Sequence, residues 1–285
     1  MTDPVPSSPA GADGYPPAAT ANYALILLLL AYILSFIDRN VMAVLIGPIR
    51  ADFAISDFQY SLLHGFAFSM FYIVMGLPIA RLADRHSRKW IITAGLVAWS
   101  AMTCLCGAAR SFGGLFLARV GVGIGEATLS PSAFSMLGDL FPREKLARAL
   151  AIYSLGITLG GGLAYVVGGA VYAWFAQDAP VTLPLLGEMR PWQMTFIAVG
   201  APGLLLAVLF GFLPEPVRRE EVARTEALGE QQPAPSIAAV LAHLNAHSRA
   251  YLAPIGAASV LSILGYGTMA WYPETTSGAF ISAAE

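Results

Sequence analysis

Seven long apolar stretches, each at least 20 residues in length, run through this chain of 285 residues. A helix of that length crosses the ~30 Å hydrocarbon core of a lipid bilayer. Hydrophobic residues make up 56% of the chain and charged residues 12%, whereas a soluble domain has about 25% charged residues. The pattern predicts an all-α membrane protein. It excludes a soluble enzyme, a disordered regulator and a nucleic-acid-binding module.

The apolar stretches define the expected spans. Because lipid offers the backbone no hydrogen-bond partners, each span is predicted to be a helix. Residues 1–21 are rich in Pro, Ala, Gly and Ser and contain no Lys or Arg, so they lack the basic start of a signal peptide and are expected to be a disordered tail. The predicted spans are residues 22–46, 59–81, 90–109, 113–138, 147–175, 192–213 and 251–272.

Basic residues alternate between the loops that join these spans. The loops after the second, fourth and sixth spans hold eleven Lys and Arg residues, while the opposite loops hold only Arg50, Arg110 and Arg190. Loops rich in Lys and Arg stay on the cytosolic side of a membrane. The N-terminus is therefore expected in the cytosol, and the end of the chain on the far side.

The longest loop, residues 214–250, is expected to be a cytosolic linker that contains a short amphipathic helix capped by Ser236. One face of this helix collects the apolar residues Ile237, Val240, Leu241 and Leu244. His243 and His247 stand four residues apart, which is a spacing that can hold a metal ion. No carboxylate or cysteine accompanies them at helical spacing, so we predict a solvated interfacial face and no metal site.

Four charged residues lie well inside the predicted spans, where an Asp, Lys or Arg costs about 2.5–3.5 kcal/mol to insert. They are Asp38 and Arg39 in the first span and Arg119 and Glu126 in the fourth. Such residues generally face the bundle interior, pair with one another and mark ion or substrate pathways. Arg119 and Glu126 are seven residues apart, so they share one helix face about 10 Å apart. That spacing suits a group from another helix held between them.

Two interpretations of these four residues stay open. In the first, Arg39 and Arg119 neutralise Asp38 and Glu126 in a closed quartet that is purely structural. In the second, Asp38 or Glu126 takes up and releases a proton as an arginine withdraws and approaches, because burial favours the protonated carboxyl and a nearby arginine favours the carboxylate. The second interpretation couples transport to a proton gradient. It predicts that Glu126→Gln abolishes proton-driven uptake.

Glycines cluster in two of the spans. Those of the fourth span, Gly121, Gly123 and Gly125, are spaced like a dinucleotide-binding loop, but such a loop needs a preceding strand and a helix that begins at the glycines. No cofactor is therefore expected. Small residues in membrane helices instead allow close packing, and they also allow bending. The glycines of the fifth span are Gly156, Gly160, Gly161, Gly162, Gly168 and Gly169.

Three of these motifs resemble those of the major facilitator superfamily. The loop ARLADRHSRK at residues 80–89 resembles the signature between the second and third helices of the family, with Ala and Ser at two positions where glycine is usual. Arg119 with Gly123 and Gly125 resembles its fourth-helix motif, and the glycines of the fifth span resemble its fifth-helix motif. The resemblance covers about residues 22–272.

Further motifs resemble the spinster-like branch of that superfamily. They are FIDR at residues 36–39, GIGEA at residues 123–127, and the segment from Ser130 to Pro142 that contains Gly138 and Asp139. The rival branch, the organic-anion and cation symporters, also has Asp-Arg in the first helix and Gly-x-x-Glu in the fourth. It usually has Trp where Asp139 stands, so Asp139 favours the spinster-like branch.

The resemblance implies a proton-linked carrier of amphipathic or lysolipid-type molecules, in which two six-helix halves rock about a midplane site. Asp38, Arg39 and Glu126 match the coupling residues of the branch, and Arg119 lies close by. The alternative within the superfamily is an organic-anion/proton symporter. The expected partners are the bilayer, a small-molecule substrate and protons, in a bacterial inner membrane, with no nucleic acid, metal or cofactor.

The resemblance of the loop at residues 80–89 to the family signature implies a cytosolic gate. Its residues are Asp84, Arg85, Arg88 and Lys89. In the implied gate the Asp84 carboxylate caps a helix N-terminus of the opposite half and pairs with Arg88. Asp84→Asn is therefore expected to impair transport and to leave membrane insertion unchanged.

Aromatic or polar-edged residues of the relevant spans are candidates for the cavity wall. They are Tyr32, Phe36, His64, Phe68 and Tyr153. Two other functional classes fit the sequence less well. An intramembrane enzyme needs a nucleophile with a base, or a His-rich metal set, and His64 is the only histidine within a predicted span. A seven-helix receptor-like protein usually has the opposite orientation of its N-terminus.

The number of spans suggests an incomplete carrier. Residues 22–213 are expected to form a six-helix N-terminal transporter half, followed by the linker at 214–250. Residues 251–285 then hold the first helix of a C-terminal half. We expect the chain to be truncated from twelve helices and unable to transport alone.

Overall fold

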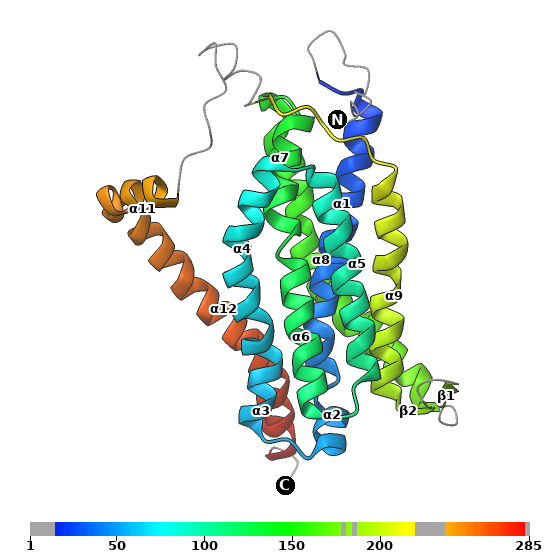
Figure 1. The fold of residues 1–285 in the computed structure, drawn as a ribbon. Helices are drawn as coiled ribbons and strands as arrows, with labels where there is room; N and C mark the ends of the chain where they lie inside the picture. The colour runs from blue at the N-terminus through cyan, green and yellow to red at the C-terminus, as the bar shows by residue number, and fades with distance from the viewer. Residues whose placement is uncertain (1–14, 178–180, 184–186, 220–236, 283–285) are drawn as a thin grey trace. The chain divides into compact units, whose positions relative to one another are not determined.

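A computed structural model describes residues 15–177, 181–183, 187–219 and 237–282 (Figure 1). The chain divides into two units, of which the first ends at Arg219 and the second begins at Glu220. Helices account for nearly all of the described residues, as the apolar stretches predicted.

The described residues of the first unit form six helical spans that are long and apolar enough to cross a membrane. Their bounds agree with the predicted spans to within a few residues at most ends. They are α1 (Ala18–Val44), the run of α3 (Asp57–Ser61), the π-helical turn η1 (Leu62–Phe66) and α4 (Ala67–Arg85), then α5 (Arg88–Ala108), the pair α6 (Phe112–Glu126) and α7 (Leu129–Leu140), α8 (Arg143–Gln177) and α9 (Pro191–Gly211). A short helix α2 (Ile46–Phe53) follows α1.

The structure differs from the predicted spans at three places. Helix α1 begins at Ala18, within the predicted tail, of which residues 1–14 lie outside the described residues. The fourth span is interrupted between α6 and α7, because Pro131 has no backbone N–H to continue the helical ladder. The loop after the fifth span carries a small antiparallel hairpin, β1 (Val181–Leu183) with β2 (Gly187–Met189), in which Thr182 faces Glu188.

Helix packing depends on glycines at the points of closest approach. Helix α8 packs along α1, α5 packs along α9, and α6 lies against both α4 and α5. A Cβ atom on Gly160 would lie 2.6 Å from the backbone oxygen of Ile33, and one on Gly123 would lie 2.5 Å from that of Phe68. Close packing therefore accounts for these two glycines. A Cβ on Gly162 would meet nothing within 4 Å, so packing does not explain every glycine of the fifth span.

Among its described residues, the second unit contains α11 (Ile237–Ala246) and α12 (Ser248–Ser282). Helix α11 lies where the linker helix was predicted, and α12 covers the predicted seventh span and continues past it to Ser282. Ser236 and the side chains of Ile237, Val240 and Leu241 lie outside the described residues, so the amphipathic face stays a prediction. The His243 and His247 rings stack 4.4 Å apart.

Candidate functional site

The four charged residues predicted inside the spans all lie in the interior of the first unit. The Asp38, Arg119 and Glu126 side chains are buried, with at most 2% of each residue exposed. Arg39 differs, since 21% of its side chain stays exposed. Asp38 and Arg39 lie on α1, and Arg119 and Glu126 lie on α6. Helix α8 packs closely against α1 at Gly160.

The central contact is an ion pair between α1 and α6. Arg39 Nε donates to Glu126 Oε2 at 2.9 Å, and Ser35 Oγ donates to the same oxygen at 2.6 Å. Ser35 lies one turn before Arg39 and also accepts from its guanidinium at 3.4 Å. One carboxylate oxygen of Glu126 is thus held by two donors from neighbouring turns of α1.

Aromatic rings surround the other side of the Arg39 guanidinium. Its Cζ atom lies 4.8 Å from the ring centre of Phe36, 4.7 Å from that of Phe68 and 4.9 Å from that of Tyr72. A guanidinium within about 6 Å of a ring face gains a cation–π interaction. Arg39 is therefore shared between a carboxylate and an aromatic cage formed by Phe36, Phe68 and Tyr72.

Asp38 is held differently from Glu126. Arg119 donates to the backbone oxygen of Asp38 at 3.1 Å rather than to its carboxylate, and the carboxylate accepts from Thr103 Oγ1 of α5 at 3.2 Å. Consecutive residues of a helix point about 100° apart, so the Asp38 and Arg39 side chains cannot both point at α6. Arg119 and Glu126 both contact the same stretch of α1, as their spacing on one face of α6 predicted.

Several polar atoms of this cluster have no hydrogen-bond partner among the residues that the structure describes. They are Asp38 Oδ1, Glu126 Oε1, and the Nε and one terminal nitrogen of Arg119. Buried polar groups are normally hydrogen-bonded. The cluster therefore has unused capacity for a proton, a water molecule or a polar ligand.

The predicted wall residues fall into two groups. Tyr32 stacks on Tyr153 with ring centres 4.5 Å apart, and it meets Phe36 edge to face at 5.2 Å. Phe36 and Phe68 belong to the aromatic cage of Arg39. His64 stands apart on η1, where its ring stacks on Tyr60 at 5.7 Å.

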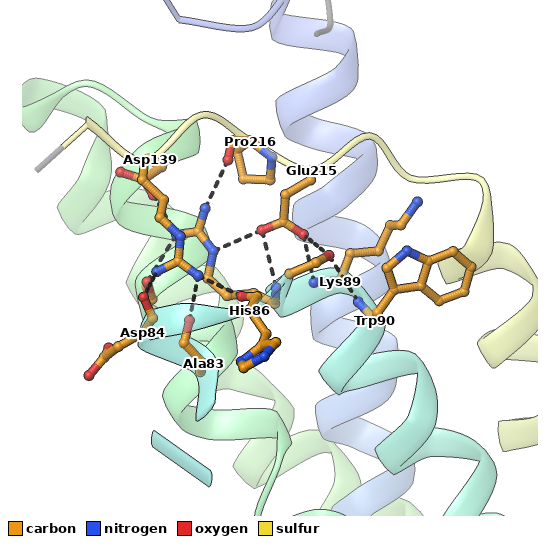
Figure 2. A network of polar contacts seen from close by, with 12 residues as sticks. Ala83, Asp84, His86, Lys89, Trp90, Asp139, Glu215 and Pro216 are labelled. Carbon is orange, nitrogen blue, oxygen red and sulfur yellow. Dashed lines mark hydrogen bonds and ion pairs between the residues drawn. The ribbon is translucent and has the colours of Figure 1, made fainter. Parts of the chain in front are cut away.

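A second polar network joins the α4–α5 loop to the segment after α9 (Figure 2). The Glu215 carboxylate accepts from the backbone N–H groups of Arg88 and Lys89 at 3.2 and 2.9 Å, and from Ser87 Oγ at 2.6 Å. Arg88 Nε also donates to Glu215 at 3.0 Å. Glu215 therefore satisfies free N–H groups at the start of α5 and places a negative charge at the positive end of that helix.

Two arginines complete this network. Buried Arg88 forms an ion pair with Asp139 of α7 and donates to the backbone oxygen of Pro216 at 2.9 Å. Arg218 donates to backbone oxygens at the end of α4, including those of Asp84 at 2.7 Å and Ala83 at 2.6 Å. The segment after α9 thus binds the end of α4 and the start of α5 together.

The four implied gate residues differ in whether their side chains take part in this network. Arg88 and Lys89 take part in the network, whereas the Asp84 and Arg85 side chains are exposed. The implied pairing of Asp84 with Arg88 is not present, because Arg88 is occupied by Asp139 and Glu215. Asp84 contributes only its backbone oxygen, to Arg218.

Sequence reasoning missed several participants. Ser35, Thr103 and Tyr72 are ordinary residues of apolar spans, and only their positions one helical turn from a charge, or on a facing helix, bring them to the cluster. Glu215 and Arg218 carried a stronger signal, since they are charged residues directly after a span.

The family model described as Major Facilitator Superfamily matches residues 28–282. The chain belongs to this superfamily. Its relatives are transporters rather than enzymes, and they include spinster-like proteins. A solved bacterial homologue of the human lysosomal transporter Spinster, in an inward-facing and occupied conformation, shares 40% identity and a TM-score of 0.65 over 70% of this chain and 45% of its own.

Two curated relatives of this chain differ in the transport activity that their names give. An MFS-type efflux pump of Mycolicibacterium smegmatis is 33% identical over 64% of this chain and 39% of its own length. The sphingosine-1-phosphate transporter SPNS2 of Mus musculus is 31% identical over 57% of this chain and 31% of its own length. The chain thus spans less than half the length of the curated relatives it matches.

Proposed function

We propose that this protein is a secondary transporter that moves an anionic amphipathic molecule, of the lysolipid type, in a proton-coupled alternating-access cycle. The observation that carries the proposal is the position of Arg39, which lies between the Glu126 carboxylate and the aromatic cage and keeps 21% of its side chain exposed. An incoming anion can reach this arginine, whereas Glu126 is closed off.

The coupling follows from charge balance. With both carboxylates ionised, Asp38 and Glu126 balance Arg39 and Arg119. When an anionic headgroup takes Arg39, Glu126 becomes a buried carboxylate without its cation, and a proton on Glu126 restores neutrality. Each anion bound therefore brings one proton to the site. The unpartnered oxygens of Asp38 and Glu126 are the acceptors available for it.

The substrate class rests on the surroundings of this arginine and on the relatives. Phe36, Phe68 and Tyr72 offer apolar and cation–π contacts beside a single charge, which suits a molecule with a charged head and an apolar body. One relative is named as a transporter of sphingosine-1-phosphate, a molecule of this kind.

We also propose a bacterial inner membrane location with the N-terminus in the cytosol, on the charge distribution of the loops.

The test uses the protein as its natural gene encodes it, reconstituted in liposomes with an internal pH dye. A panel of lysophospholipids and short organic anions is added with and without a pH gradient. Proton movement that depends on a lysolipid supports the proposal. Proton movement only with short organic anions would assign the protein to the symporter alternative, and substrate movement without protons would contradict the coupling.

A further inference from the structure

A cavity of about 830 Å³ opens between the start of α1, the end of α7 and the start of α8. It lies within the first unit, at the ends of spans, where lipid headgroups meet a membrane protein. Neither the charged cluster around Arg39 nor the network around Glu215 contributes a residue to its lining.

Three cations line this cavity. Arg143, Lys145 and Arg148 are exposed along its wall, and Glu144 is the one carboxylate among the lining residues that the structure describes. Across residues 15–177, 187–219 and the second unit as described, none of these three cations forms an ion pair. The described part of the lining therefore carries more positive than negative charge.

Two of these cations lie at the start of α8, with Glu144 as the one acidic residue in that first turn. Helix α8 begins at Arg143 and runs for 35 residues. The N-terminal end of a helix carries partial positive charge, so acidic residues are normally favoured there and basic ones disfavoured. Arg143 and Lys145 stand in the first turn. A bound anion would relieve both the repulsion among the cations and their repulsion by the helix end.

The floor of the cavity is apolar. Ala21 and Leu25 of α1, Leu140 of α7 and Ile152 of α8 line its inner part, and the first three are buried. A general preference for basic residues on one side of the membrane explains the number of cations. It does not explain why they surround a hollow with an apolar floor.

We propose that this cavity binds an anionic phospholipid of the leaflet at that end of the bundle. The phosphate contacts Arg143, Lys145 and Arg148, and the upper part of an acyl chain lies against Leu25 and Ile152. Basic pockets between membrane helices are known to take anionic lipid headgroups. The inference stands apart from the proposed transport function, because it requires neither a proton nor a transported substrate.

The first test measures lipid retention by native mass spectrometry of the detergent-solubilised protein, titrated with dioleoyl phosphatidylglycerol or dioleoyl phosphatidylcholine. The triple variant Arg143→Gln, Lys145→Gln, Arg148→Gln is expected to lose at least tenfold in affinity for phosphatidylglycerol. Its matched control removes three cations from other loops of the same predicted side: Arg85→Gln, Arg224→Gln, Arg249→Gln. The control is expected to stay within twofold of wild type. Equal losses in both triple variants would show diffuse attraction and overturn the proposal.

A second pair of variants tests the cavity without changing charge. Ala18 lines the cavity and is exposed, while its neighbour Ala19 is exposed and does not line it. Ala18→Trp is expected to weaken phosphatidylglycerol binding at least fivefold, and Ala19→Trp to leave it unchanged. Circular dichroism checks that both variants keep the helical content. Unchanged binding in Ala18→Trp would overturn the proposal.

Other occupants give distinct results. Displacement of the lipid by millimolar inorganic phosphate alone would show a phosphate site and overturn the assignment to lipid. The chain carries Asp3 and Asp13 near its start. The variant Asp3→Asn, Asp13→Asn is expected to bind lipid like wild type, and a tenfold gain would identify the start of the chain as the occupant and contradict the proposal.

Discussion

Arg39 and Glu126 form an ion pair with an Nε–Oε2 distance of 2.9 Å, across 87 positions of the sequence. The two partners differ in exposure, because the Glu126 side chain is fully buried and 21% of the Arg39 side chain is exposed. An anion can therefore compete for the arginine, whereas a proton is what the glutamate can accept. This asymmetry supports the proposed coupling, which the variants Glu126→Gln and Arg39→Met test.

Glu126→Gln is expected to abolish proton-driven uptake, a loss of at least tenfold. Gln keeps an oxygen that accepts from Ser35 and Arg39, but it cannot bind and release a proton. Substrate exchange without a pH gradient should persist. Uptake and exchange are measured in the same proteoliposomes, with exposed Glu188→Gln as the matched control. Full proton-driven uptake in Glu126→Gln would exclude this residue from coupling.

Arg39→Met is expected to destabilise the fold by about 3–5 kcal/mol, because it leaves a buried carboxylate without its partner. The double variant Arg39→Met, Glu126→Gln should recover part of that loss, since no charge is then left unpaired. Thermal unfolding in detergent, followed by tryptophan fluorescence, measures both. If the double variant is less stable than the wild type by the sum of the two separate effects, the two residues are not coupled.

Gly160→Ala is expected to cost about 1–3 kcal/mol, as overpacking does. Its Cβ would lie 2.6 Å from the backbone oxygen of Ile33, so α8 must move away from α1 next to the charged cluster. Gly162→Ala is the matched control, because nothing lies within 4 Å of its Cβ position. It should be neutral or gain about 0.5–1 kcal/mol in helix propensity. The same unfolding assay compares them, and equal costs would contradict the packing assignment.

Glu215→Ala is expected to destabilise the first unit by about 1–3 kcal/mol, because it leaves the start of α5 and the buried Arg88 without a carboxylate. Asp84→Ala should change stability by less than about 0.5 kcal/mol, since its side chain is exposed. Denaturation of the two variants in one detergent gives the comparison. A loss of stability in Asp84→Ala as large as that in Glu215→Ala would contradict the assignment of the structural role to Glu215.

Several features of the protein follow from local patterns. Lipid forces every apolar stretch of sufficient length to satisfy its own backbone, so the helices of the first unit could be placed within a few residues. A charge inside such a stretch has to face the bundle interior, so Asp38, Arg39, Arg119 and Glu126 could be selected without a structure. The break before Leu129 was missed because proline is tolerated in many membrane helices.

The pairing among those charges could not be read from local patterns, because it depends on the depth and rotation at which distant helices meet. The approach of α8 to α1 at Gly160, and of α6 to α4 at Gly123, places Glu126 beside Arg39 and leaves Asp38 to Thr103. The same holds at the other network, where Glu215 reaches Arg88 across 127 positions and takes the place expected for Asp84. Spacing along one helix fixes which side chains share a face, and only the packing of helices decides which of them become partners.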